Sequence, residues 1–442
     1  MTDSALPRVL RPFRTGQYRI LAIALTMSLF GAGVWIIALV LQVKETGGGP
    51  IELSVVATGG AIGMLLAVLF GGVLADRVPQ KFILLGVEVT KTLVIGAAAV
   101  LALTDRLELW HLAVVAFVIG VAEGFFYPAY SALLPSVLPA DDLLAANGFE
   151  GVLRPAVMQA AGPAVAALVV AAASPGLAFA IVVVSQVLAV AVLIFLRTTP
   201  VRREFGEERR HPVRALFGDI GGGFGYMFRT PWLLATLLFA SLLMLLVIGP
   251  IEVLLPFAVF DQTGGGAAAF ALVIGAFGVG GAVGSVVIAS FTLPRRYLTW
   301  MNLMWGAGCI PLVVIGLTDQ LWVMVIAVFA VGFTFSGATV IWGTLLQRRV
   351  PPELLGRVSS LDFFVSLLFM PVSMALAGPV GEAIGVAPAF IVAGAVPVVL
   401  AVVAILAGRL PKDEIEHPLD PAQSEIDPAS QEILGPNAPI QG

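Results

Sequence analysis

The chain has 442 residues, of which 59% are hydrophobic and 12% are charged, and its net charge at pH 7 is −4. The apolar share exceeds the roughly 45–50% of an ordinary soluble domain, and the mean hydropathy is +1.00. A water-soluble core cannot bury so much apolar side chain, so the composition excludes a soluble domain. It predicts an all-α polytopic membrane protein, with no nucleic acid among its partners.

Cysteine and histidine are too scarce to build a metal site. The one cysteine, Cys309, lies within an apolar stretch, so neither an intramolecular disulfide nor a site of several Cys ligands can form. The three histidines stand far apart, at segment ends or in polar stretches, at positions 111, 211 and 417. We therefore expect no metal and no other cofactor.

Twelve apolar stretches, each about 20 residues or longer and so able to cross the hydrocarbon core of a bilayer, follow one another along the chain. The first is too long for the apolar core of a signal peptide and no cleavage site follows it, so we expect a retained span. The predicted spans cover residues 19–43, 53–75, 82–103, 110–134, 150–173, 177–197, 232–260, 267–292, 298–317, 321–346, 358–381 and 387–409.

Basic residues are distributed unevenly among the connections between these spans. Cytoplasmic connections are enriched in Lys and Arg, and with the amino terminus inside, 20 of the 24 Lys and Arg residues fall on inner segments. Only Lys44 and Arg106 fall on outer segments, while Lys91 and Arg154 lie within spans. The asymmetry predicts that both termini are cytoplasmic.

The longest internal polar connection, residues 198–231, divides the spans into two bundles of six, at 1–197 and 232–409. Residues 410–442 are acidic and rich in Pro, and we expect a disordered cytoplasmic tail there. The two bundles share features at nearly one spacing: LPADDL at 138–143 and VPPELL at 350–355, Gly-Pro at 162–163 and 378–379, and GxxxG at 59–63 and 280–284. Such repeats place a solute site at the interface of the halves, near the bilayer midplane.

Several motifs resemble those of one transporter family. GVLADRVPQK at 72–81 is similar to the loop signature of the major facilitator superfamily, with Pro79 where the family has Gly. The segments GFFYPAYSALLP, LLAAN, GRVSSL and GPIEVLLPFAVFD, which begin at residues 124, 143, 356 and 249, resemble bacterial twelve-helix drug/proton antiporters. That group includes macrolide, tetracycline and multidrug exporters, and the last segment is similar to its mycobacterial members. The resemblance implies the major facilitator fold, two pseudo-symmetric six-helix bundles in the bacterial inner (plasma) membrane.

Acidic side chains inside the spans are the candidates for proton coupling or substrate binding. Glu123 and Glu252 lie in the fourth and seventh spans, which line the central cavity in the resembling family. A carboxylate in this environment can take up and release a proton as its exposure alternates; each acid could instead be structural. Arg154 is the third candidate, since it could pair with Glu150 or reach Glu123. Glu88 and Lys91, three residues apart, are expected to form a neutral structural pair.

Other residues are assigned by their positions in the resembling family. The candidates for gating between the bundles are Gly72, Asp76, Arg77, Lys81, Arg357, Ser359 and Asp362. The expected helix-packing residues are Gly162, Pro163, Gly378 and Pro379. Aromatic side chains that could line a substrate cavity, or simply pack, are Trp35, Phe125, Phe126, Tyr127, Phe335 and Trp342.

No GxxxxGK[ST] loop for binding ATP phosphates occurs, so uphill transport requires an ion gradient. We predict a monomeric secondary active transporter, not an enzyme, whose partners are protons, membrane lipids and a small lipophilic molecule. The leading hypothesis is proton-coupled multidrug efflux by alternating access. The alternatives are an exporter or flippase of an endogenous lipid, lysophospholipid or siderophore, and a membrane receptor or scaffold that does not transport.

Overall fold

A computed structural model describes residues 8–198, 225–291, 293–351, 358 and 362–419 of the chain. Its helices include twelve that are long and apolar enough to span a membrane, which confirms the predicted number. In the first half these are α1 (Gly16–Glu45), α2 (Pro50–Arg77), α3 (Gln80–Leu103), α4 (Leu109–Val137), a fifth span formed by α5 (Ala140–Arg154), η2 (Pro155–Ala161) and α6 (Gly162–Ala172), and α7 (Pro175–Ile194).

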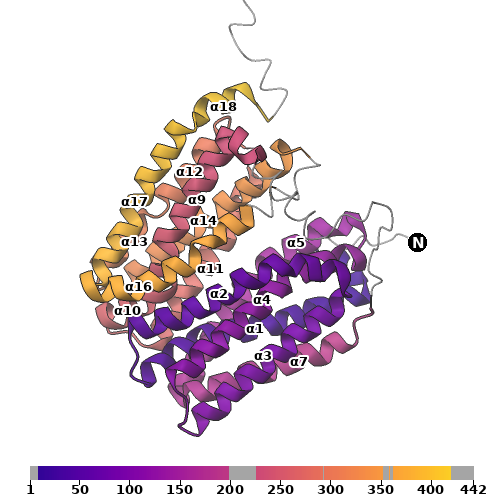
Figure 1. The fold of residues 1–442 in the computed structure, drawn as a ribbon, viewed down its shortest axis with the longest axis vertical. Coiled ribbons are helices and arrows are strands. Elements are labelled where there is room, and N and C mark those ends of the chain that lie inside the picture. The colour runs from indigo at the N-terminus through magenta and orange to yellow at the C-terminus, as the bar shows by residue number, and fades with distance from the viewer. Residues whose placement is uncertain (1–7, 199–224, 292, 352–357, 359–361, 420–442) are drawn as a thin grey trace, which may run out of the picture.

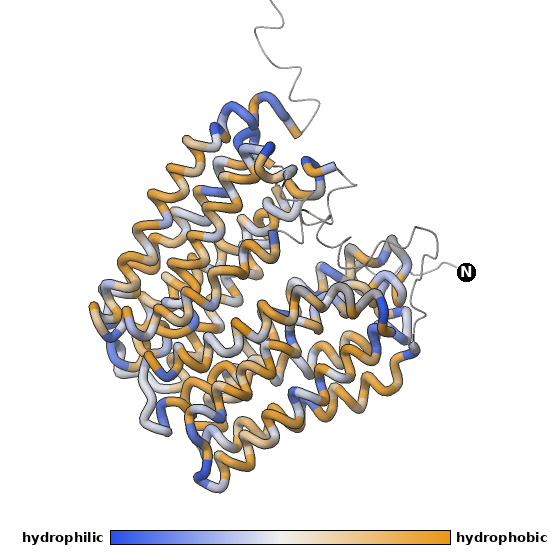
Figure 2. Tube along the Cα trace, in the orientation of Figure 1, coloured by the Kyte–Doolittle hydropathy of each residue, from blue (hydrophilic) through white to orange (hydrophobic). Residues whose placement is uncertain are grey.

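The second half repeats the order of the first. Its seventh span consists of α9 (Pro231–Gly249), η3 (Pro250–Leu254), α10 (Leu255–Phe257) and η4 (Ala258–Gln262). Then follow α11 (Ala267–Ser290), α12 (Tyr297–Ala307) with α13 (Ile310–Leu317), α14 (Leu321–Arg349), an eleventh span (Asp362–Ile384) that ends in α16 (Met370–Ile384), and α17 (Val386–Ala407). Hydrophobic residues dominate the helices, and hydrophilic ones gather at their ends (Figure 2).

Two of the longer spans contain turns of π-helix that the periodicity does not predict. Pro155 begins η2 and Pro250 begins η3. Proline has no N–H to give to the preceding turn, so the backbone bonds there must rearrange, and a π-turn is one way to do so. The ninth span is also interrupted, between α12 and α13, where Pro311 follows directly after the break.

Glycines set the same helix pairs close together in both halves. A Cβ atom at Gly63 of α2 would lie 2.3 Å from the carbonyl oxygen of Phe117 on α4. At the corresponding position of the repeat, a Cβ at Gly284 of α11 would lie 2.1 Å from the carbonyl oxygen of Phe333 on α14. Since no Cβ can occupy such a space, each GxxxG motif brings two backbones into contact. The GxxxG motifs that repeat in the sequence therefore form the same kind of close helix contact in both halves.

Because the spans run alternately up and down, α1 begins and α17 ends on the same side of the molecule (Figure 1). We call this the termini side, and the side where α1 ends and α2 begins the far side. The halves contact each other through α2 with α16 and through α11 with η2 and α6. In Figure 1 the two sets of ribbons lie together at the far side and separate toward the termini side.

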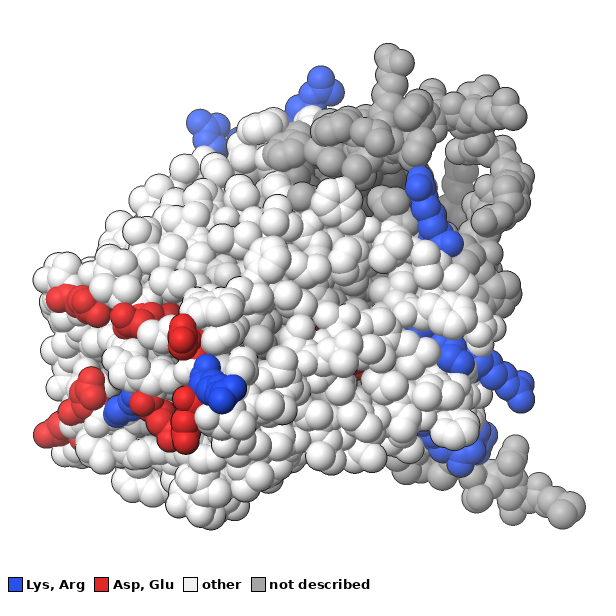
Figure 3. Space-filling view, turned by 60° about the horizontal axis from the view of Figure 1, so that its bottom comes forward, with Lys and Arg blue, Asp and Glu red and all other residues white. Residues whose placement is uncertain are grey.

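Charged side chains are sorted between the two sides. Acidic groups gather at one end of the surface in Figure 3, and basic groups project from the other. The described helix ends on the far side carry Glu45, Glu52, Asp105, Glu108, Asp261, Asp319 and Glu382, against Lys44 and Arg106. Among the described helix ends, the far side therefore carries mainly acidic side chains.

The expectation of a disordered tail from residue 410 is wrong for its first residues. Leu410–Glu416 form α18, a short helix that packs on the termini-side ends of α12 and α17. Leu410 is fully buried and Glu414 is nearly so. The hydrophilic composition concealed this docking because the segment buries only a few side chains; residues 420–442 lie outside the described residues.

Candidate functional site

Four polar side chains meet inside the first half, where α1, α3 and α4 pack together. Lys91 Nζ donates a 2.8 Å hydrogen bond to Oε1 of Glu123 and a 3.1 Å bond to Oγ of Ser28. The same nitrogen lies 3.6 Å from Oε1 of Glu88, one turn earlier on α3. Ser28 in turn donates a 2.7 Å bond to Glu88. We call these four residues the charge cluster.

The members of the charge cluster differ in their access to other molecules. Glu88 is 0% exposed and Lys91 is 2% exposed, whereas the side chain of Glu123 is 38% exposed. Burying an ion inside a membrane protein is costly unless an opposite charge pairs with it, and here each ion has such a partner. With both acids ionised, the cluster has an excess of one negative charge, and Glu123 is the accessible member.

Glu123 has a different partner from the one that the sequence suggested. Glu88 and Lys91 do form the expected pair, but Lys91 also reaches across to Glu123 on α4. Arg154 interacts electrostatically with Glu150 instead, and the carboxylate of Glu150 accepts the hydroxyl of Tyr130. The sequence placed Lys91 within a span, which was the available signal, but the rotation of α3 relative to α4 could not be read from it.

Glu252 lies in the other half, within the π-helical turn η3. Its side chain is exposed, and it has no hydrogen bond or ion pair with any residue that the structure describes. The turn η3 contacts α16 of its own half and α2 of the other. Glu252 is therefore an unpaired acid on a segment that lies where the halves meet.

The far-side contact between the halves is built from backbone and small side chains. Ser54 of α2 donates a 2.7 Å bond to the carbonyl oxygen of Met374 and accepts a 2.6 Å bond from the N–H of Gly378, both in α16. Nearby, Lys44 Nζ lies 4.4 Å from the ring centroid of Phe260 in η4. Gly378, which was expected only to pack helices, thus takes part in closing the far side. Ser54 was not among the candidates, because a single serine in an apolar span does not indicate a functional role.

The aromatic candidates in the first half do not share one cavity. Trp35 packs on the ring of Phe179 in α7, with the ring centroids 5.1 Å apart. Phe126 is buried and lies 5.9 Å from Lys91 Nζ, measured to its ring centroid. Phe125 instead lines an apolar cavity of about 370 Å³ between α2, α3 and α4. Tyr127 is 53% exposed and stacks on Phe363 of the eleventh span, so it links the halves.

In the second half, the two remaining aromatic candidates pack into the protein. Phe335 contacts the hydrophobic core of its half. Trp342 is buried against Trp232 and Trp305, and its indole N–H donates a 3.0 Å bond to Asp362. Trp342 therefore anchors the start of the eleventh span.

Two of the gating candidates, Asp362 and Lys81, form hydrogen bonds within their own halves. Asp362 accepts its hydrogen bond from Trp342 of its own half. Lys81 donates a 2.7 Å bond to the carbonyl oxygen of Ile194 at the end of α7, also within one half, and Arg77 is exposed. The surroundings of Gly72, the side chain of Asp76, and residues Arg357 and Ser359 lie outside what the structure describes. Of the packing candidates, Gly162 and Pro163 are buried against α1, whereas Pro379 is exposed.

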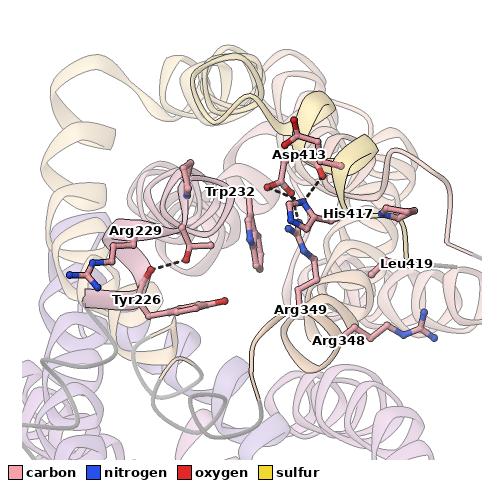
Figure 4. A pocket seen from close by; sticks show the side chains of 12 residues that line it. Tyr226, Arg229, Trp232, Arg348, Arg349, Asp413, His417 and Leu419 are labelled. Carbon is pink, nitrogen blue, oxygen red and sulfur yellow. Dashed lines mark hydrogen bonds and ion pairs between the residues drawn. The ribbon is translucent and has the colours of Figure 1, made fainter. Parts of the chain in front are cut away.

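A second polar cluster, shown in Figure 4, holds α18 to the termini side of the second half. Arg349 at the end of α14 forms an ion pair with Asp413 and lies 4.6 Å from the ring centroid of Trp232. In the figure, Arg349 points toward Asp413 and His417, while Arg229 and Arg348 point outward from the cavity of about 660 Å³. Glu414 accepts a 2.6 Å bond from the backbone N–H of Thr299 near the start of α12. Burial raises the pKa of Glu414, and the bonds from Thr299 oppose the rise.

We expect Asp413→Asn to loosen α18. The side chain of Arg349 is 8% exposed, and a buried charge that loses its partner costs about 1–3 kcal/mol or more. The variant should show a lower thermal unfolding temperature and faster proteolytic cleavage after Lys412. Glu416→Gln, which affects only an exposed pair with Lys412, serves as the control, and equal behaviour of the two variants would contradict the expectation.

Residues 8–434 match the family model described as transmembrane secretion effector, which covers nearly the whole chain. The chain belongs to this family. The match makes it a multi-pass membrane transporter of the major facilitator type, not an enzyme. Macrolide efflux protein A of Streptococcus pyogenes is similar, with 24% identity over 88% of this chain and 95% of that protein.

The multidrug efflux pump Tap of Mycolicibacterium fortuitum is 26% identical to this transporter over 86% of the chain and 93% of Tap. Among solved structures, the nucleoside transporter NupG has a TM-score of 0.66 and 13% identity, and the match covers 88% of this chain and 98% of NupG. At this identity the likeness concerns the fold alone. These matches confirm the resemblance to the major facilitator superfamily and its drug efflux group.

Proposed function

We propose that this transporter is a proton-coupled exporter of lipophilic or amphiphilic small molecules, which works by alternating access in the bacterial plasma membrane. The efflux activities named for the similar proteins of S. pyogenes and M. fortuitum support export as the direction. The observation that carries the proposal is the charge cluster, because it places an accessible acid beside buried ions inside a membrane-spanning bundle.

The charge balance of the cluster suits exchange of one positive charge. Glu88, Lys91 and Glu123 together have an excess of one negative charge when both acids are ionised, and an unpaired charge inside the membrane is costly. A proton or the positive group of a substrate on Glu123 removes that excess. Since one carboxylate cannot hold both at once, binding of the substrate excludes the proton, which is the requirement for antiport.

Alternating access requires contacts that can form on one side and break on the other. The far-side contact of Ser54 with Gly378 is one such closure. With the termini in the cytoplasm, as the distribution of basic residues indicates, this conformation is closed to the outside. Glu252, which has no polar partner in the described part of the chain, lies next to the contact of the halves and is the second acid that a substrate or proton would meet.

The proposal is tested by transport into proteoliposomes that contain the purified protein. A pH gradient should drive accumulation of a fluorescent lipophilic cation, and a protonophore should abolish it. Glu123→Gln should reduce this uptake at least tenfold, because a glutamine cannot exchange a proton. The matched control is Glu45→Gln, which changes an exposed acid at the far-side end of α1.

Two results would contradict the proposal. If Glu123→Gln and Glu252→Gln both keep the full proton-driven uptake, the acids do not carry the coupling. If a pH gradient drives no uptake or release of any lipophilic cation or neutral drug by the unmodified protein, proton-coupled drug export is wrong, and a screen of lipids and siderophores by thermal shift then identifies the cargo.

A further inference from the structure

We infer that Lys91 is an internal counter-ion that leaves Glu123 when a substrate cation or a proton binds there, and that Glu88 is the residue that then holds it. The inference rests on the proposed function, because it assumes that Glu123 is the exchanging acid. It assigns Glu88 and Lys91 a positioning role for a site that accepts a single positive charge.

The hydrogen bonds of Lys91 show that the ammonium group is shared. An ammonium group has three N–H donors. One binds Glu123 at 2.8 Å and one binds Ser28 at 3.1 Å. The distance from Nζ to Oε1 of Glu88, 3.6 Å, is beyond a good hydrogen bond but within the range of an ion pair. Lys91 is therefore bound to Glu123 and lies within reach of Glu88.

Glu88 has capacity left to receive the ammonium group. Its Oε1 accepts the hydroxyl of Ser28, while Oε2 is buried and has no hydrogen-bond partner in the described part of the chain. Shortening the 3.6 Å separation by about 0.8 Å would give an ordinary charge-assisted hydrogen bond. Ser28 contacts both residues and can keep its bonds to both during so small a movement.

The charge on Glu123 decides which of two positions the Lys91 ammonium group favours. While Glu123 is ionised, Lys91 lies between two carboxylates and is drawn to both. Once a proton or an ammonium group neutralises Glu123, only Glu88 attracts Lys91, and the Lys91–Glu88 pair is then neutral by itself. All charges in the cluster are compensated only when it holds one additional positive charge. The site should therefore favour monovalent cations over neutral molecules of the same shape.

The other groups around the cluster do not compete for this role. The helices that pack against α3 are α4 and α7, and α1 joins it through Ser28. Among the described residues, only Glu88 and Glu123 are charged partners of Lys91. The ring of Phe126 lies 5.9 Å away and is uncharged. A movement of Lys91 away from Glu123 thus has one charged destination.

Equilibrium binding of tetraphenylphosphonium to the purified full-length protein tests the inference, with triphenylphosphine oxide as the neutral counterpart. Glu88→Gln removes the holding acid, so Lys91 stays on Glu123 and cation binding should weaken about tenfold or more. Adding Lys91→Met to Glu88→Gln leaves Glu123 without a competitor, and binding should recover to at least the original affinity. Binding of the neutral compound should change little in either variant.

The neutral compound separates this role from a structural one, because damage to the fold by Glu88→Gln would weaken the binding of triphenylphosphine oxide as well as that of the cation. If Glu123→Gln abolishes cation binding but Glu88→Gln and the double variant bind like the original protein, the inference is wrong and the proposed function stands. If Glu123→Gln binds the cation normally, the inference is wrong and Glu123 is not the exchanging acid, which leaves Glu252 as the acid for the proposed function. A double variant that binds more weakly than Glu88→Gln also overturns the inference.

Discussion

Lys91→Met alone should destabilise the transporter by about 3–5 kcal/mol, the cost of removing one partner from a buried ion pair. The substitution leaves the carboxylates of Glu88 and Glu123 without their shared ammonium group, and Glu88 is fully buried. The loss can be measured as a lower midpoint of unfolding in detergent.

The matched control for Lys91→Met is Lys412→Met. The Lys412 side chain is 70% exposed and forms a surface pair with Glu416, and exposed pairs contribute about 0–1 kcal/mol. Adding Glu88→Gln to Lys91→Met should restore much of the stability, since it removes one of the two unpaired acids. If Lys91→Met and Lys412→Met unfold alike, the charge cluster does not stabilise the first half in the way described.

Gly378→Leu should open the far side. A Cβ at this position would lie 2.4 Å from the carbonyl oxygen of Pro50 on α2, which is backbone and cannot move aside. Overpacking of this kind costs roughly 1–3 kcal/mol. The cost falls on the far-side-closed conformation alone, so the ratio of closed to open molecules should fall about 5- to 150-fold. Transport should slow, because one end state of the cycle is disfavoured.

Cross-linking across the far side measures this shift. A Cβ at Gly49 would lie 3.9 Å from Oε1 of Glu382, so Gly49→Cys with Glu382→Cys, in a Cys309→Ser background, forms a reporter pair. A short bifunctional reagent should join the pair readily, and Gly378→Leu should reduce the yield. Gly86→Leu is the control, since no atom lies within 4 Å of its Cβ position. Equal cross-linking in the two variants would show that Gly378 does not control closure.

The sequence by itself determined the twelve spans, their division into two halves and the repeated GxxxG motifs. Apolar length and helix packing are local properties, so hydropathy and small-residue spacing carry them directly. The family resemblance added the fold and the candidate acids in the fourth and seventh spans. It also led to Gly378, although only as a residue that packs helices.

Only the tertiary structure decided which charged groups meet. Glu88 and Lys91 are one turn apart and were recognisable as a pair, but whether Lys91 also reaches Glu123 depends on how α3 is rotated against α4. In an almost uniformly apolar helix no polar face records that rotation, so the sequence analysis named Arg154, and not Lys91, as the residue that could reach Glu123. The docking of α18 through Asp413 and Glu414 was hidden for a related reason. Its binding depends on a few specific polar contacts, which composition does not reveal.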